Sequence, residues 1–101
     1  MSFAGKWECL TKSAYGDNIS IWEIEEKDGV YTGTSDAFGA KVPFQSVKFA
    51  DNKFTCELVA PIGGIETKLT MEGQYVPETD MIYGAAESNM GSTSYEGKRI
   101  K

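Results

Sequence analysis

Hydrophobic and polar side chains alternate along two stretches of the chain, residues 53–60 and 65–76. Successive side chains of a β-strand point to opposite faces, so this period of two predicts strands with one face turned toward a core. In the first stretch Phe54 falls on the core side, and in the second Leu69 and Met71 do so. Polar residues fill nearly every position of the opposite face of the second stretch, which therefore predicts a half-buried strand.

Clusters of glycine, proline, asparagine and aspartate recur at nearly regular intervals, as they do between consecutive hairpins. Valine, isoleucine, threonine and aromatic residues are frequent between the clusters. These runs predict eight strands, at residues 6–11, 19–26, 30–35, 42–50, 53–60, 65–76, 81–88 and 92–100. No run has the length and period of a crossover helix, so neighbouring strands are expected to be antiparallel. The predicted fold class is all-β, an antiparallel eight-stranded meander closed into a flattened barrel.

Two predicted strands do not keep a strict alternation. In the run 19–26 two isoleucines fall on one face, while Trp22 and Ile24 fall on the other. A bulge near Trp22 that returns all of them to the core is favoured over an apolar surface patch that binds a partner or ligand. The same conflict in the run 42–50 predicts a bulge or bend at Gln45–Ser46.

Composition indicates a single globular domain spanning residues 1–101, because 41% of the residues are hydrophobic and 25% are charged. The net charge is -5 and the lysines are scattered, so nucleic acid is not an expected partner. The sequence contains no apolar run of the length that a membrane helix needs, and its first residues lack the layout of a signal peptide. The protein is therefore expected to be cytoplasmic, with no membrane partner.

Residues capable of catalysis are few. The chain has no histidine, which is the commonest catalytic base at neutral pH and the commonest zinc ligand. Cys9 and Cys56 lie inside predicted strands and are expected to be reduced core residues, with a disulfide between them the less favoured alternative. The acidic run of Glu23, Glu25 and Glu26 is interpreted as a solvated hairpin end. No enzymatic activity and no cofactor are predicted.

The segment Phe3-Ala4-Gly5-Lys6-Trp7, followed by Gly29-Val30-Tyr31-Thr32-Gly33-Thr34, resembles the first hairpins of calycin-type barrels, which include avidins, lipocalins and fatty-acid-binding proteins. The whole chain, with Gly97-Lys98-Arg99 near its end, also resembles small bacterial β-barrel domains of unassigned function. The resemblance implies a calycin-like barrel in which Arg99 packs on Trp7. Physical reasoning supports this pair, because closure makes the first and last strands neighbours and a guanidinium stacks favourably on indole. Nothing after Thr34 matches the biotin-binding pattern of avidins, so biotin binding is not implied.

Continuing the strand phase places many small residues on the inner face. They predict either a barrel flattened until its walls touch, which is favoured, or a cavity for a small molecule. The predicted function is noncatalytic binding of a small apolar or amphipathic ligand. The residues expected to line a cavity are Tyr31, Ser35, Ser88, Tyr95 and Arg99 as polar contacts, and Trp7, Phe54, Leu69 and Met71 as apolar wall. For Trp7 and Arg99, a role in closing the barrel is favoured over ligand contact.

An interaction module without a ligand is the alternative function. It would form a homodimer or bind another protein through aromatic and aliphatic anchors, because such side chains dominate many protein interfaces. The candidate anchors are Tyr15, Trp22, Ile24 and Phe38.

Overall fold

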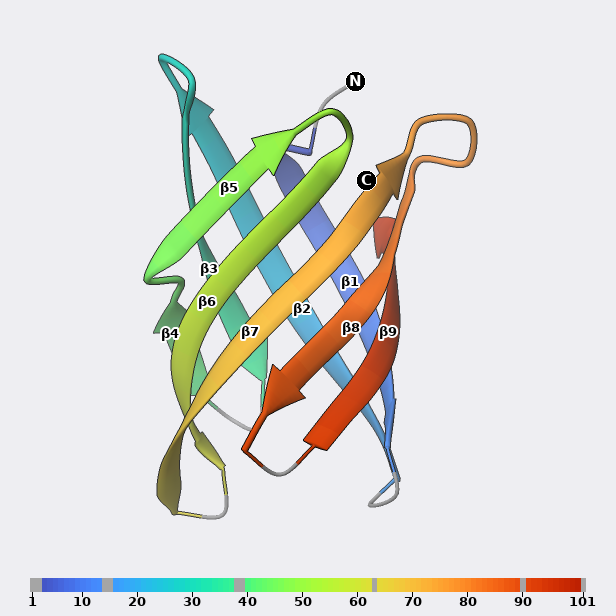
Figure 1. Ribbon diagram of the computed structural model, residues 1–101. Coiled ribbons are helices and arrows are strands. Elements are labelled where there is room, and N and C mark those ends of the chain that lie inside the picture. Colours follow the sequence, from blue (N-terminus) through green and yellow to red (C-terminus); the bar gives the residue numbers. More distant parts are fainter. Residues whose placement is uncertain (1–2, 14–15, 38–39, 63, 90, 101) are drawn as a thin grey trace.

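The computed structural model describes residues 3–13, 16–37, 40–62, 64–89 and 91–100. These residues form one antiparallel sheet of nine strands, which confirms the all-β antiparallel prediction (Figure 1). Along the chain the strands are β1 (Gly5–Ser13), β2 (Gly16–Lys27), β3 (Val30–Ala37), β4 (Ala40–Pro43), β5 (Ser46–Ala50), β6 (Lys53–Ile62), β7 (Ile65–Val76), β8 (Met81–Ser88) and β9 (Gly91–Arg99). Their order in the sheet is β4-β3-β2-β1-β9-β8-β7-β6-β5. No helix among the described residues is long and apolar enough to cross a membrane.

The sheet has nine strands instead of eight because the run 42–50 is divided between β4 and β5. The backbone N–H of Phe44 donates to the carbonyl oxygen of Gly33 on β3, at 2.8 Å. The next N–H, that of Gln45, donates to the carbonyl oxygen of Glu57 on β6, at 2.6 Å. The chain therefore bends between these two residues and passes from one edge of the sheet to the other. The predicted bend at this point is confirmed.

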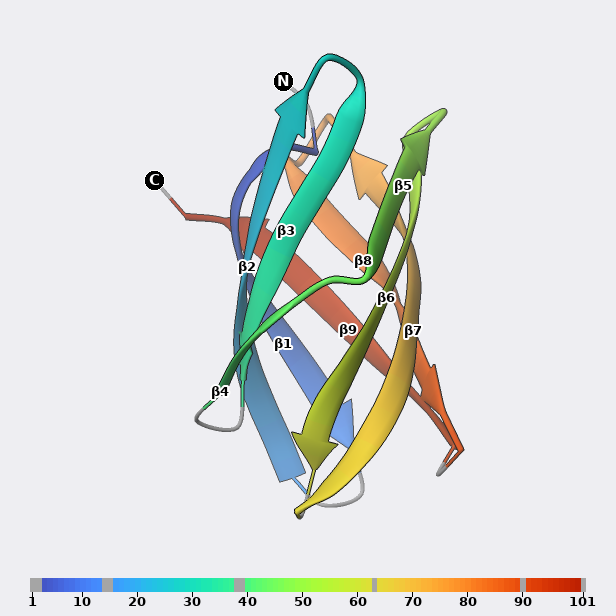
Figure 2. The ribbon, with the colours of Figure 1, turned by 90° about the vertical axis from the view of Figure 1, so that its left-hand side faces the viewer.

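The sheet curls around a common interior (Figures 1 and 2). Its edge strands β4 and β5 follow one another in the chain, and the rings of Tyr31 on β3 and Phe49 on β5 lie 5.6 Å apart between centroids. No ladder of backbone hydrogen bonds joins β3 or β4 to β5 within the described residues. The sheet is thus curled but not closed into a barrel, and the predicted closed barrel is not confirmed.

The first and last strands lie side by side, as predicted. β1 and β9 pair antiparallel, with Trp7 opposite Arg99 and Cys9 opposite Gly97. The register also confirms the predicted inner face, because it carries the phase of Trp7 through every strand. Residues placed on this concave face include Tyr31, Ser35, Phe54, Leu69, Met71, Ser88, Tyr95 and Arg99.

The favoured bulge in β2 is wrong. The register of β2 runs without interruption against both β1 and β3. Trp22 and Ile24 point inward and are each 3% exposed, whereas Ile19 points outward and is 58% exposed. Trp22 and Ile24 are therefore core residues and cannot anchor a partner. The other candidate anchors, Tyr15 and Phe38, lie outside the described residues.

The curled sheet has two different ends. One holds the start of β1, the end of β9 and inward rings such as Phe54, and we call it the aromatic end. The other holds the end of β1, the end of β8 and the start of β9. We call it the hydroxyl end because of the inward residues described below.

Candidate functional site

Phe3 fills the interior at the aromatic end. Its side chain is fully buried, and its ring stacks on Phe54 at 4.6 Å and on Phe49 at 5.3 Å between centroids. The indole N–H of Trp7 donates to the carbonyl oxygen of Phe3 at 2.8 Å, which fixes the segment before β1 across this end. The sequence analysis allowed either a cavity or a filled interior behind the small inner residues. At this end the interior is filled by aromatic rings of the protein itself.

Aromatic rings also fill the middle of the interior. The indole of Trp22 contacts three rings from other segments, with centroids 5.5 Å from Phe44, 6.0 Å from Phe54 and 5.3 Å from Tyr95. Edge contacts of this kind add to the hydrophobic stabilisation that the rings gain from burial. The Tyr95 hydroxyl donates to the carbonyl oxygen of Glu72 at 3.1 Å, so its polar atom is satisfied within the fold.

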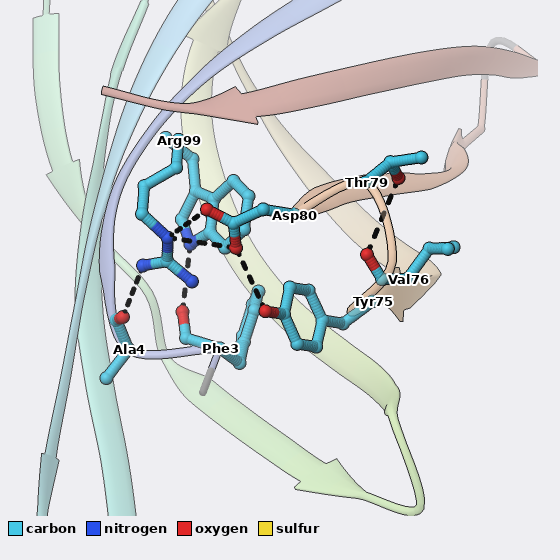
Figure 3. A network of polar contacts seen from close by, with 8 residues as sticks. Phe3, Ala4, Tyr75, Val76, Thr79, Asp80 and Arg99 are labelled. Carbon is cyan, nitrogen blue, oxygen red and sulfur yellow. Dashed lines mark hydrogen bonds and ion pairs between the residues drawn. The ribbon is translucent and has the colours of Figure 1, made fainter. Parts of the chain in front are cut away.

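Arg99 joins four parts of the aromatic end (Figure 3). Its Nε donates to both carboxylate oxygens of Asp80, at 2.8 and 3.1 Å, and its Nη1 donates to the carbonyl oxygen of Ala4 at 2.8 Å. The guanidinium carbon lies 4.3 Å from the ring centroid of Trp7. These contacts connect the start of β1 to the end of β9, its neighbour in the sheet.

Tyr75 completes this network from β7. Its hydroxyl donates to Asp80 at 2.9 Å, and burial raises the pKa of the phenol, with the hydrogen bond to Asp80 as the next cause. The hydrogen bond to Asp80 raises the pKa of Arg99 as well. The arrangement holds the phenol and the guanidinium on one carboxylate.

The predicted ligand residues all face inward, but they do not form one site. The aromatic end contains Trp7, Tyr31 and Arg99. The middle and the hydroxyl end contain Tyr95, Met71, Ser35 and Ser88. The ring of Phe3 packs against Trp7 and Tyr31 of the first group.

Inward-facing side chains at the hydroxyl end are uncharged, and they alternate between hydroxyl-bearing and apolar residues. Hydroxyl groups here belong to Thr11, Ser20, Ser35, Thr67, Ser88 and Thr93. Apolar side chains between them are Val42, Leu58, Leu69, Met71 and Ala86. Ser35, Leu58, Thr67 and Met71 are at most 8% exposed, and the others of this set are half-buried. At the other end Phe3, Trp7, Phe54 and Tyr75 are at most 2% exposed, whereas Tyr31 and Phe49 are half-buried. No described inward residue at the hydroxyl end carries a charge.

The thiols are unsuited to catalysis. Cys9 and Cys56 are free and fully buried, which confirms the prediction of core cysteines. Burial raises the pKa of both thiols, in the case of Cys56 to about 12. A thiol in this state lacks the thiolate that acts as nucleophile. Among the described residues no three metal-ligating side chains gather into a metal site.

The buried thiols and phenols predict a loss of stability in alkali. In the unfolded chain they ionise near 9.0 and 10.0, but burial raises the pKa of Cys9, Cys56, Tyr75 and Tyr95 in the folded state. The folded state then binds more protons, so the free energy of unfolding is constant below about pH 9 and falls as the pH rises further. Urea denaturation between about pH 7 and pH 11 measures this fall. A Cys56→Ala variant should show a smaller loss above pH 9.0 than the parent, and equal stability of the parent across the range would contradict the buried state.

Two residues of the network were not recognised in the sequence. Phe3 precedes the first predicted strand, and a single apolar residue there gives no periodic signal. Asp80 lies among turn residues, which it resembles in type, and it has a positive φ of 53°. Arg99 was the only signal that pointed to Asp80, because a buried guanidinium is usually paired with a carboxylate. The sequence contains fifteen acidic residues, however, so the partner could not be chosen among them.

The fold and interior thus define an all-β protein built from one curled antiparallel sheet around a core rich in aromatic residues. No protein-family model matches the chain, and a comparison with curated proteins finds no significant relative.

Proposed function

We propose that the protein binds a small, uncharged, amphipathic molecule at the hydroxyl end of the curled sheet, without catalysing a reaction. The observation that carries this proposal is the group of uncharged, half-buried side chains, among them Ala86, Ser88 and Thr93, that face inward at that end. Tyr95 and Met71 would form its apolar floor, and Ser35, Ser88 and Thr93 would provide hydroxyl contacts. An apolar concave surface with a few polar groups is the usual composition of a small-molecule site.

A calycin-like relationship belongs to the same proposal. Its support is the packing of the Gly-x-Trp tryptophan under the arginine of the last strand, with Arg99 4.3 Å from the ring of Trp7. A segment that seals one end of the curled sheet leaves the opposite end as the entrance. Because the inner face there is uncharged, a neutral ligand suits it better than an anion or a cation.

A pair of variants tests this site. Ala86 faces inward at the hydroxyl end, while its neighbour Ala85 faces outward on the same strand. The neutral apolar dye N-phenyl-1-naphthylamine should bind the parent protein and the Ala85→Phe variant equally. Ala86→Phe should weaken that binding about tenfold or more, because its ring fills the space that the dye needs.

Thermal unfolding of both variants separates loss of binding from loss of fold. A folded Ala86→Phe variant that binds the dye as well as the parent does would refute the proposed location. A parent protein that binds no dye, and that retains no small molecule in native mass spectrometry, would refute the binding function itself.

A further inference from the structure

One half of β7 has a strand partner on one side only. Residues Ile65–Leu69 pair with β6, but the pairing of β7 with β8 begins only at Thr70. Figure 1 shows the β6–β7 hairpin extending past the end of β8. Free edges of this kind are able to pair with a strand of another molecule.

The backbone groups that face this edge can be assigned from the hydrogen bonds. The N–H of Tyr75 donates to the carbonyl oxygen of Asn52, which precedes β6, so odd-numbered residues of β7 direct their backbone groups toward β6. Even-numbered residues direct theirs toward the opposite side, because the direction alternates along a strand. The N–H and C=O groups of Glu66 and Lys68 therefore point to the open edge.

The edge is also open in space. A shallow groove of about 450 Å³ runs beside it, lined by Glu66, Thr67 and Lys68 on one side and by Ser88 and Asn89 from the end of β8 on the other. At the start of the edge, Ile65 is 70% exposed. An exposed isoleucine next to unpaired strand backbone is a feature that monomeric proteins usually avoid.

The sequence of this edge is complementary to itself. Residues 65–69 read Ile-Glu-Thr-Lys-Leu, so an antiparallel pairing around a two-fold axis at Thr67 sets each Glu66 opposite Lys68 of the second copy. In the same register Ile65 meets Leu69. Opposite charges and apolar pairs across strands both stabilise an antiparallel sheet. In this register the backbone groups of Glu66 form hydrogen bonds with those of Lys68 in the second copy. These are the residues whose backbone groups face the edge, so backbone geometry and side-chain charge favour the same alignment.

Two other edges within the described residues lack this property. A two-fold pairing of β5 would place Lys48, its central residue, opposite the same lysine of the second copy. Like charges directly opposite one another destabilise a strand pair. At the start of β2, residues 16–20 are not paired with β3. A two-fold pairing around Asn18 would there place Asp17 opposite Ile19, which forms neither an ion pair nor an apolar pair.

We propose that two copies of this chain associate through antiparallel pairing of residues 65–69, which makes one sheet continuous across a two-fold axis. The interface is isologous, as in most homodimers. Each copy covers the exposed Ile65 of the other and satisfies the free backbone groups of its β7 edge. This inference does not depend on ligand binding, because the β7 edge lies beside the interior and not within it.

Charge reversal tests the alignment. Lys68→Glu sets like charges opposite one another at both symmetry-related positions, and it should weaken self-association by about tenfold or more in sedimentation velocity. Glu66→Lys should do the same. Mixing these two variants should restore association, because each strand then meets one of opposite charge. Lys68 also lies 3.0 Å from Glu57, so thermal unfolding of each variant is followed to confirm the fold.

A control variant and hydrogen exchange complete the test. Lys48→Glu on the exposed face of β5 should leave association unchanged. The amides of Glu66 and Lys68 should become protected as protein concentration rises, while those of Thr67 and Leu69 keep their protection from β6. The proposal would be overturned if the parent protein stayed monomeric up to about millimolar concentration, because a specific homodimer should have formed by then. A failure of the mixed variants to associate, or weakened association in Lys48→Glu, would also overturn it.

Discussion

Replacing Gly84 by alanine is expected to destabilise the protein by about 3 kcal/mol, which is near the upper end for adding one methyl group to a packed site. Gly84 lies on the inner face of β8, directly opposite Gly73 on β7. An added Cβ would collide with the carbonyl oxygen of Glu72 and lie 2.7 Å from the Cα of Gly73. Both atoms belong to the backbone, so β7 and β8 would have to move apart.

Gly97→Ala provides the matched comparison. This glycine also faces inward, but its Cβ would meet side chains, 2.7 Å from Cγ1 of Ile82 and 2.9 Å from the Cys9 sulfur. Side chains of this kind can rotate away, so the expected cost is about 1 kcal/mol. Urea denaturation followed by tryptophan fluorescence measures both variants. Equal losses in the two would show that the backbone contact at Gly84 does not limit the approach of β7 and β8.

These glycines explain why the sequence predicted the inner face but not what fills it. The alternation in residues 53–60 and 65–76 identified the inner faces of β6 and β7 correctly, although Ile65 at the start of β7 is 70% exposed. The small residues on this face were compatible with either a cavity or a filled interior. In the structure Phe54 lies over Gly73, and the Tyr95 hydroxyl lies over Gly84. Each glycine admits the ring of its direct partner on the neighbouring strand, because Gly73 pairs with Phe54 and Gly84 with Tyr95. The period within one strand does not show which residue stands opposite.

The errors in strand number and phase have different physical causes. Trp22 and Ile24 keep their alternation, and the two outward isoleucines are tolerated because single apolar residues on a surface cost little. The sequence could not exclude a bulge there, since a bulged strand and a regular strand with two outward isoleucines have the same pattern of apolar residues. At Phe44 and Gln45 the pattern predicted the bend, but not that the chain changes its strand partner from β3 to β6. A change of partner depends on how far the whole sheet curls.

The tryptophan and arginine pair was predictable because a motif and a physical requirement agreed on it. Gly5, two residues before Trp7, adopts a φ of +140°, and an added Cβ there would collide with Nη1 of Arg99. Glycine is therefore required for the guanidinium to reach the carbonyl oxygen of Ala4. This contact gives the Gly-x-Trp element of this chain a structural reason that does not involve a ligand.

Arg99→Met is expected to destabilise the protein by about 3 kcal/mol, because it removes the ion pair with Asp80, the hydrogen bond to Ala4 and the contact with the Trp7 ring. The side chains of Arg99 and Asp80 are only 14% and 26% exposed, so solvent compensates for little of the loss. Asp80→Asn removes the charge and keeps the size, and it should cost less than Arg99→Met. In a double-mutant cycle measured by urea denaturation, the two changes together should cost less than their sum, because each removes the same ion pair.

Lys98→Met is the control for this substitution, and it distinguishes the network from a general loss of positive charge. Lys98 precedes Arg99 on β9 but faces outward, and it lies 3.6 Å from Glu8 with 68% of its side chain exposed. Exposed ion pairs contribute little, so we expect a change within about 0.5 kcal/mol. If Lys98→Met destabilised the protein as much as Arg99→Met, the loss of stability would follow from the change in net charge. The contacts of Arg99 with Asp80, Ala4 and Trp7 would then not be its cause.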